Sequence, residues 1–179
     1  SMPTDDGEVS ILLASFWVDY DFADAYELNM AEGRFYSRDW GSDTLAIVLN
    51  ETAVKAFGLT DPLGKEVITF TGPPPNGRTL LKIVGVVEDY HFETPQREIR
   101  PMCMHLMGDG DTPNIPNWGK FVTVKYDPGQ IDRTLAHIDE SWKQFAGDQA
   151  LEYEYFDELY NEMFYTEKQS ASIVLLFAI

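Results

Sequence analysis

The amino-acid sequence predicts an α+β fold, and three observations lead to this prediction. Short apolar segments, separated by turn-forming glycines and prolines, follow one another through the first 107 residues, which is typical of strands joined by turns. Residues 131–145 repeat apolar side chains at every third or fourth position, which indicates an amphipathic helix. Alternating segments on both sides of this helix are expected to be strands. We therefore predict a βαβ lobe with a β-rich lobe inserted into it.

The predicted strands are apolar or alternating segments bounded by turn residues. In chain order they are residues 11–18, 45–49, 67–71, 80–87, 102–107, 121–126 and 151–155. Residues 32–34 and 61–64 are expected to form turns, because they contain glycine or the pair Asp-Pro. Residues 72–77, with three prolines, are expected to form a hairpin tip, and residues 108–119 a long loop.

Two helices are predicted in the first half of the chain from their terminal residues. Asp19 or Asp21 is the candidate cap of a short helix that ends near residue 28. Asn50 is the expected cap of a helix over residues 51–57, since its side chain can accept a free amide proton of the first turn. Gly58 is expected to end this helix in the left-handed conformation.

Two further helices are predicted near the C-terminus. Asp127 and Pro128 are favourable residues for the start of the amphipathic helix, and Gly147 is its expected end. The apolar stripe of this helix consists of Ile131, Leu135, Ile138, Trp142 and Phe145. A last helix is expected to begin at Asp157 and to continue into the apolar residues 172–179.

The net charge excludes some classes of partner. The chain has 13 basic and 30 acidic side chains, which gives a net charge of −17. This field repels nucleic acids and disfavours contact with an anionic membrane surface. Cys103 is the single cysteine, so an internal disulfide is impossible. Its neighbours are apolar, and we expect a buried, unreactive thiol.

The two ends of the sequence suggest a fragment of a longer protein. Ser1-Met2 is typical of an expression tag remnant. Residues 172–179 are almost wholly apolar but are fewer than the roughly 20 residues that a membrane span needs. We interpret them as the start of a truncated transmembrane helix, and a C-terminal core strand or helix is the alternative.

The acidic segment after residue 87 is the strongest candidate for chemistry. It gathers Glu88, Asp89, His91 and Glu93. In an extended chain Asp89, His91 and Glu93 would point to one face and could hold a divalent metal. The alternative is structural, with Tyr90 and His91 anchoring a turn between two lobes by packing and hydrogen bonds.

Other motifs do not strengthen the case for an enzyme. His105 and His137 have no characteristic spacing to this segment, and neither a phosphate-binding loop nor a nucleophile elbow occurs. Ser10, Ser15 and Ser37 have no motif that places a histidine nearby. We therefore assign no catalytic, cofactor-binding or metal-binding residue. Trp118 is the aromatic residue that we expect to be exposed.

Several segments, in chain order, resemble the extracytoplasmic core domain of MacB/FtsX-type ABC transporter permeases, especially the form common in Bacteroidetes. They are residues 18–22 (VDYDF), 30–36 (MAEGRFY), 48–53 (VLNETA), 58–65 (GLTDPLGK) and 83–101 (IVGVVEDYHFETPQREIRP). Each motif alone is weak, and their common order carries the resemblance. The final helix that enters an apolar segment is similar to the family's return into its second membrane span.

The resemblance implies a domain over residues 3–170 and the start of a membrane helix at 171–179. It implies a β-rich lobe at about residues 30–115, inserted into a porter-like lobe of residues 10–29 and 116–170. Such a domain lies on the periplasmic side of the cytoplasmic membrane and has no catalytic residue or cofactor. Its motif glycines and prolines would serve the backbone.

The resemblance also implies partners and a role. A cytoplasmic ATPase subunit, a second permease copy and a periplasmic adaptor or lipoprotein are the implied partners. The role would be mechanotransmission, in which ATP-driven movement is passed to substrates or proteins outside. Two alternatives stay open: an extracytoplasmic ligand- or peptide-binding module, and a metal-dependent hydrolase at Asp89, His91 and Glu93.

Overall fold

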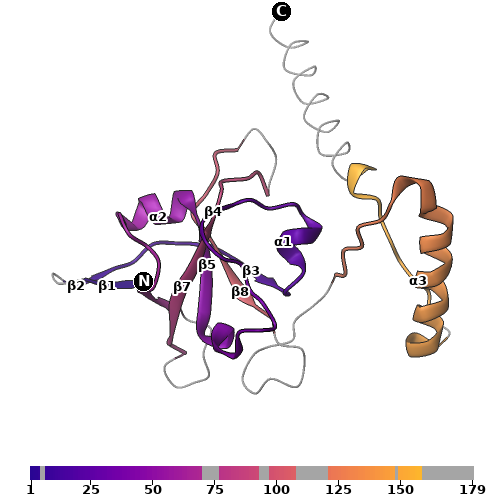
Figure 1. Cartoon of the computed structure of the whole chain (residues 1–179), viewed down its shortest axis with the longest axis horizontal. Coiled ribbons are helices and arrows are strands. Elements are labelled where there is room, and N and C mark those ends of the chain that lie inside the picture. Colours follow the sequence, from indigo (N-terminus) through magenta and orange to yellow (C-terminus); the bar gives the residue numbers. More distant parts are fainter. Residues whose placement is uncertain (5–6, 70–76, 93–96, 108–120, 148, 159–179) are drawn as a thin grey trace, which may run out of the picture. The chain divides into compact units, whose positions relative to one another are not determined.

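The computed structural model describes residues 1–4, 7–69, 77–92, 97–107, 121–147 and 149–158 (Figure 1). The chain divides into two compact units. The first comprises Ser1–Phe92 and Arg97–Val124, and the second comprises Glu93–Gln96 and Lys125–Ile179. A mixed β-sheet with short helices makes up the first unit, and the second contains a long helix. The α+β class predicted from the sequence is thus confirmed.

One mixed sheet of six strands dominates the described part of the first unit. Its strands are β3 (Ala14–Val18), β4 (Met30–Gly33), β5 (Ala46–Asn50), β6 (Glu66–Thr69), β7 (Thr79–Val87) and β8 (Met102–Leu106). The strand order is β3-β8-β5-β7-β4, and β6 pairs with the first half of β7. The pairs β3–β8 and β5–β7 are parallel, whereas β5–β8, β4–β7 and β6–β7 are antiparallel.

The two central strands, β5 and β8, are buried along their whole length because both faces of the sheet are covered. On one face, Ile47 and Leu49 pack with Ala53 and Phe57 of helix α2 (Glu51–Phe57). On the other, the side chains of β8 pack with aromatic residues that include Phe22 of helix α1 (Phe22–Ala25). Continuous apolar sequences are expected for strands that are covered on both faces.

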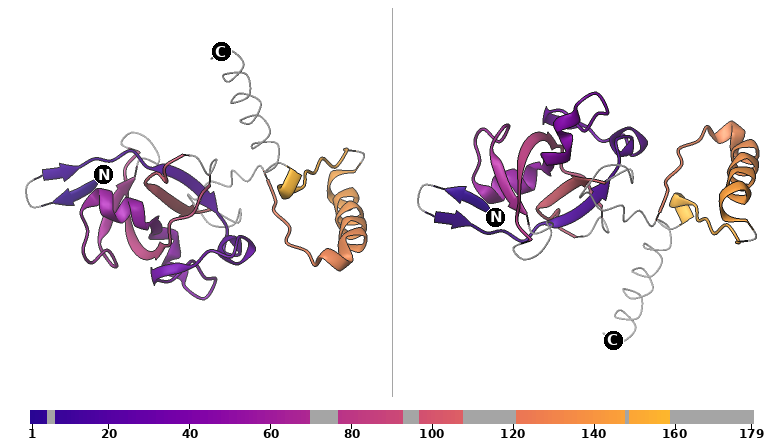
Figure 2. Two further views of the ribbon diagram at one scale, coloured as in Figure 1. Left: turned by 90° about the horizontal axis from the view of Figure 1, so that it is seen from above. Right: turned by 90° about the horizontal axis from the view of Figure 1, so that it is seen from below.

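A small hairpin extends this sheet at its β6 edge. Strands β1 (Met2–Thr4) and β2 (Gly7–Val9) pair in antiparallel fashion. Ser1 and Ile68 exchange backbone hydrogen bonds of 2.7 and 2.6 Å, which place the start of β1 beside β6. Figure 2 shows the hairpin projecting from the rest of the first unit in both views.

The helix at residues 51–57 has the predicted ends. The Asn50 side chain accepts a hydrogen bond from the Ala53 amide, and Gly58 has φ = 68°. The prediction for the earlier helix is only partly right, because α1 follows Asp21 but the Asp21 side chain does not cap it. Asp21 instead forms an exposed ion pair with Arg38 at 2.9 Å. This ion pair lowers the pKa of Asp21 through the Arg38 hydrogen bond.

The turn predicted at residues 32–34 is wrong, because Gly33 is the last residue of strand β4. Gly33 has φ = 69° and lies opposite Gly85 of β7, next to an irregularity in the β4–β7 register. A side chain on Gly33 would collide with the Val84 carbonyl, and one on Gly85 would collide with the Arg34 carbonyl. The two glycines therefore allow the two backbones to approach closely.

The amphipathic helix of the second unit is also confirmed. Asp127 accepts a hydrogen bond from the Gly129 amide at 3.0 Å and begins a 3₁₀ turn, Pro128–Gln130, which leads into helix α3 (Ile131–Ala146). None of the residues of α3 is buried, and Phe145 of the predicted apolar stripe is 89% exposed.

The strands predicted on both sides of α3 are wrong. Residues 121–126 and 151–155 are described as irregular chain, and Phe121 and Val122 are about 90% exposed. Alternation shows that a segment has one apolar side, but a strand also needs a neighbour to pair with. No such neighbour lies beside these segments among the described residues.

Several predicted features lie outside the described residues. They are most of the hairpin tip at 72–77, the loop at 108–119, Glu93, Trp118, most of the last helix and the apolar residues 171–179. In the described part of the chain, no helix has the length and apolar character that crossing a membrane requires. The boundaries of the lobes implied by the resemblance stay a prediction.

The Gly33–Gly85 approach gives a direct test of the fold. We expect Gly85→Ala to lower the free energy of unfolding by about 2 kcal/mol or more, because the added Cβ forces β4 away from β7. Gly41→Ala is the matched control, since a Cβ on the exposed Gly41 meets no atom within 4 Å. We expect its effect to stay within about 0.5 kcal/mol in urea titrations. Equal stability of the two variants would contradict the β4–β7 pairing.

Candidate functional site: a polar junction at the ends of β5 and β7

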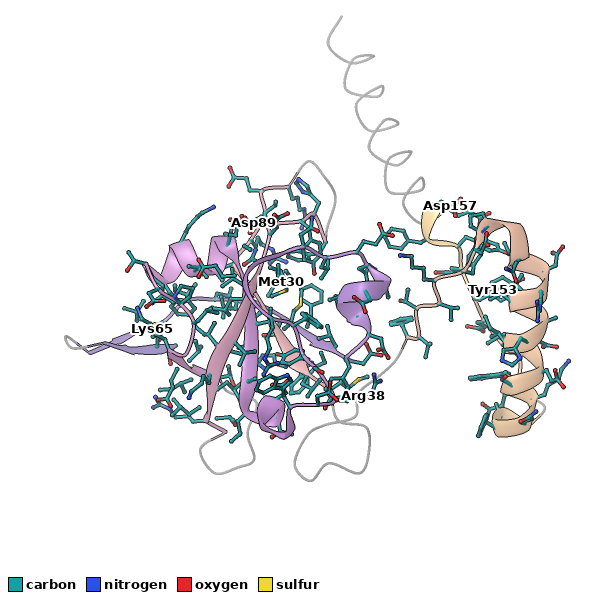
Figure 3. The ribbon with its side chains drawn as sticks, viewed as in Figure 1. Met30, Arg38, Lys65, Asp89, Tyr153 and Asp157 are labelled. Atoms are coloured by element: carbon teal, nitrogen blue, oxygen red, sulfur yellow. The ribbon has the colours of Figure 1, made fainter. Side chains whose placement is uncertain are left out.

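The candidate site lies where three segments of the first unit meet. Strands β5 and β7 are parallel, and Asn50 at the end of β5 lies opposite Val87 at the end of β7. Helix α2 begins directly after Asn50, and Asp89 follows Val87 by two residues. Figure 3 shows Asp89 beside α2. We call the side chains of Asn50, Thr52 and Asp89 the polar junction.

Asn50 uses its complete hydrogen-bonding capacity at this junction. Its Oδ1 atom accepts from the amides of Ala53 and Met102, both at 2.9 Å. Its Nδ2 group donates to Asp89 Oδ1 at 2.9 Å and to the Arg100 carbonyl at 3.0 Å. The side chain is fully buried, and two donors and two acceptors are all that an amide offers. Asn50 thereby joins β5, α2, β8 and the segment that follows β7.

Asp89 is a second cap for α2, although 37 residues separate it from Thr52. Its Oδ1 atom accepts from the Thr52 amide at 2.9 Å, and its Oδ2 atom accepts from the Thr52 hydroxyl at 2.7 Å. The Lys55 ammonium is 3.9 Å from Oδ2. The Asp89 amide donates to Glu51 Oε2 at 3.2 Å, so the backbone of Asp89 also contacts the first turn of α2. A carboxylate at a helix N-terminus is stabilised by the free amides there.

The other residues of the acidic segment have separate environments. Glu88 accepts a hydrogen bond from the exposed Asn29 side chain at 3.2 Å. Tyr90 packs against the core cluster of β8, where burial raises its pKa to about 12. Its hydroxyl is 3.6 Å from Met102 Sδ. His91 is exposed and makes no hydrogen bond or ion pair with another described residue. Tyr90 thus packs within the first unit, whereas His91 makes none of the predicted contacts there. The part of this prediction that concerns a turn between two lobes stays a prediction.

The metal-binding hypothesis is not favoured by this geometry. Asp89 directs its oxygens to α2, and His91 points to solvent without sharing a partner with it. Across the described ranges, no three His, Cys, Asp or Glu side chains gather closely enough to hold a metal ion. Glu93, the third residue of the predicted trio, lies outside these ranges.

A second polar group joins β3 and β8, and we did not predict it from the sequence; its Cys103 and His105 are buried, whereas Ser15 is exposed. The parallel register places Ser15 opposite Cys103 and Trp17 opposite His105. Cys103 Sγ is 3.3 Å from Ser15 Oγ and 3.4 Å from His105 Nε2. Because 88 residues separate Ser15 from Cys103, only the strand pairing reveals this contact. The two-residue spacing of Cys103 and His105 on one strand was the available signal.

The thiol and imidazole of this group are not arranged for nucleophilic catalysis. Burial raises the pKa of Cys103 and lowers the pKa of His105 to about 4. Both shifts favour the neutral forms, whereas a catalytic cysteine acts as a thiolate. Cys103 is buried, as the sequence predicted, and the remaining histidine, His137, is exposed on α3.

The polar junction predicts a graded loss of stability on substitution of Asp89. We expect Asp89→Ala to cost about 2–3 kcal/mol, because it leaves the Thr52 amide and an Asn50 donor with fewer partners. Asp89→Asn retains part of the hydrogen bonding and should cost about 1 kcal/mol. Asp39→Ala, at an exposed site, serves as the control in the same urea titrations. A loss in Asp89→Ala no larger than in this control would contradict the capping role.

Removal of metal ions is expected to leave the protein unchanged. We predict that EDTA does not shift the melting temperature and that His91→Ala changes the free energy of unfolding by less than about 0.5 kcal/mol, as is usual for exposed residues. Elemental analysis of the purified protein checks the metal content directly. A melting temperature that falls with EDTA, and no longer does so in His91→Ala, would restore the metal hypothesis.

Comparison with known proteins gives matches among solved structures only. No protein-family model matches the sequence, and no curated protein matches it significantly. The periplasmic region of MacB from Actinobacillus actinomycetemcomitans is similar, with a TM-score of 0.45 and 20% identity over 75% of this chain. A domain of a putative permease protein from Porphyromonas gingivalis is similar with a TM-score of 0.42 and 16% identity over 79% of this chain. The chain covers 59% of the MacB region and 69% of the permease domain.

Proposed function

We propose that this chain is a non-catalytic extracytoplasmic domain of an ABC transporter permease of the MacB/FtsX type. In this proposal it passes ATP-driven movement to substrates or proteins outside the cytoplasmic membrane. One observation carries the proposal: residues of three of the family-like motifs, at 30–36, 48–53 and 83–101, contact one another and connect backbone segments of the first unit.

The glycines of two motifs meet in space. Gly33, from the motif at residues 30–36, lies opposite Gly85, from the motif at residues 83–101. Neither position has room for a side chain. Two motifs that are about fifty residues apart in the sequence thus form one close backbone contact, which explains why both need glycine.

The motif at residues 48–53 meets the same long motif at the polar junction. Asn50 and Thr52 bind Asp89 through their side chains and backbone. Asn50 also binds the Arg100 carbonyl, and the next carbonyl, that of Pro101, accepts from the Ala14 amide at 2.9 Å. The motif at residues 83–101 is therefore bound to neighbouring strands near both of its ends, through β7 at its start and through Arg100 and Pro101 at its end.

A domain that transmits movement needs this kind of connection, because its segments must move as one body. Hydrogen bonds from the junction reach β5, α2 and the start of β8, and β8 is paired with the edge strand β3. Because these hydrogen bonds are short and the elements are closely packed, we expect a displacement of one element to displace the others. The implied ATPase subunit, second permease copy and adaptor belong to the proposal as partners.

Labelling in cells tests the proposed location. Thr44 is exposed in the 3₁₀ helix Gly41–Leu45 before β5, whereas the native Cys103 is buried. In cells that produce the full-length protein, we expect a membrane-impermeant maleimide to label Thr44→Cys before the cytoplasmic membrane is lysed. The unsubstituted protein, with Cys103 alone, is the control and should stay unlabelled. Labelling of Thr44→Cys only after lysis would place the domain in the cytoplasm and refute the proposal.

The same cysteine tests movement. With a spin label at Thr44→Cys, we expect the distance distribution between two permease copies to change when ATP and vanadate trap the co-purified ATPase. An ATPase subunit that cannot bind ATP is the control and should leave the distribution unchanged. Failure of any ATPase to co-purify, or identical distributions in both nucleotide states, would contradict mechanotransmission.

A further inference from the structure

The edge strand β3 is held to β8 by a row of four side chains on one face of the sheet. Ser15 lies opposite Cys103, and Trp17 lies opposite His105. The Trp17 and His105 rings stack, with their centroids 4.9 Å apart and an interplanar angle of 27°. In the described part of the chain, β8 is the one strand that pairs with β3. Contacts of His105 therefore bear directly on whether β3 stays in place.

His105 is buried, and no negatively charged side chain contacts it within the described ranges. Its side chain is 3% exposed. Trp17 on β3, Ile47 on β5 and Cys103 on β8 are its neighbours across and along the strands, and all are uncharged at neutral pH. Among the residues that the structure describes, no carboxylate contacts this imidazole, so a proton on it would place a charge in an apolar environment.

We propose that His105 is an acid-sensitive latch: its neutral ring holds β3 against β8, and its protonation releases β3 while the rest of the sheet stays folded. Release gives the imidazolium access to water, which removes the cost of burying its charge. An edge strand is the element that can leave most easily, since only one neighbour loses its hydrogen bonds. The inference concerns regulation and does not depend on the proposed function.

The direction and range of the pH effect follow from the two states of His105. Burial lowers its pKa to about 4 in the closed state, and release restores the ordinary value of 6.5. Between these two values the released state binds more protons, so its share grows as the pH falls. The equilibrium constant for release should rise by about 100-fold from neutral pH to pH 4. Above pH 7 the latch is closed and insensitive to pH.

Hydrogen exchange measured by mass spectrometry tests the latch on the intact chain. After correction for the intrinsic exchange rate, we expect protection of the β3 amides to fall about 60-fold between pH 7 and pH 4.5. Amides of β5 and β7 should keep their protection. His105→Gln, which cannot be protonated, should abolish the pH dependence of β3. His137→Gln removes an exposed histidine and should behave like the unsubstituted protein.

Two outcomes of this experiment would overturn the proposal. If β5 and β7 lose protection together with β3, acid unfolds the whole unit and no latch exists. If His105→Gln keeps the acid response of β3, another group is responsible. Histidine titration by NMR covers the case in which the variant does not fold, because it needs no substitution. A His105 signal that titrates near pH 6.5 with β3 still protected would also overturn it.

Discussion

The buried amide of Asn50 is the contact on which the rest of the first unit depends. It ends β5, caps α2, fixes the first amide of β8 and binds Asp89 after β7. An aspartate at this position would lack both donors, and an alanine would leave the Met102 and Ala53 amides without their acceptor. Because the four contacts come from different parts of the chain, one side chain sets the register of β5 relative to both of its neighbours.

A second constraint fixes the loop between β4 and β5. Asp43 has a side chain only 1% exposed, and it accepts two hydrogen bonds from the Arg34 guanidinium, at 2.8 and 2.6 Å. The Ser37 amide donates to the same carboxylate at 2.9 Å, and Trp40 stacks on Arg34. A buried charge is tolerated when it is paired and fully hydrogen-bonded, as here. Arg34 directly follows Gly33, so Asp43 fixes the segment that leaves the close contact of Gly33 with Gly85.

What the sequence could predict depends on how far apart the cooperating residues are. Helix α2 was predictable because Asn50, Ala53 and Gly58 act within one short segment. The second cap, Asp89, was visible only as part of an acidic segment, since its partner Thr52 is far away in the sequence. The strands at 121–126 and 151–155 were predicted from alternation, which reports the two sides of a segment but not the neighbour that a strand requires.

Polar residues that resemble catalytic groups have structural roles in this unit. A catalytic side chain must keep a lone pair or a proton free for its substrate, whereas Asn50 and the Asp89 carboxylate direct theirs to the chain's own backbone and hydroxyl groups. Cys103 and His105 are held neutral by burial, which opposes nucleophilic attack. Internal hydrogen bonds and neutral buried groups of this kind stabilise the relative positions of the strands.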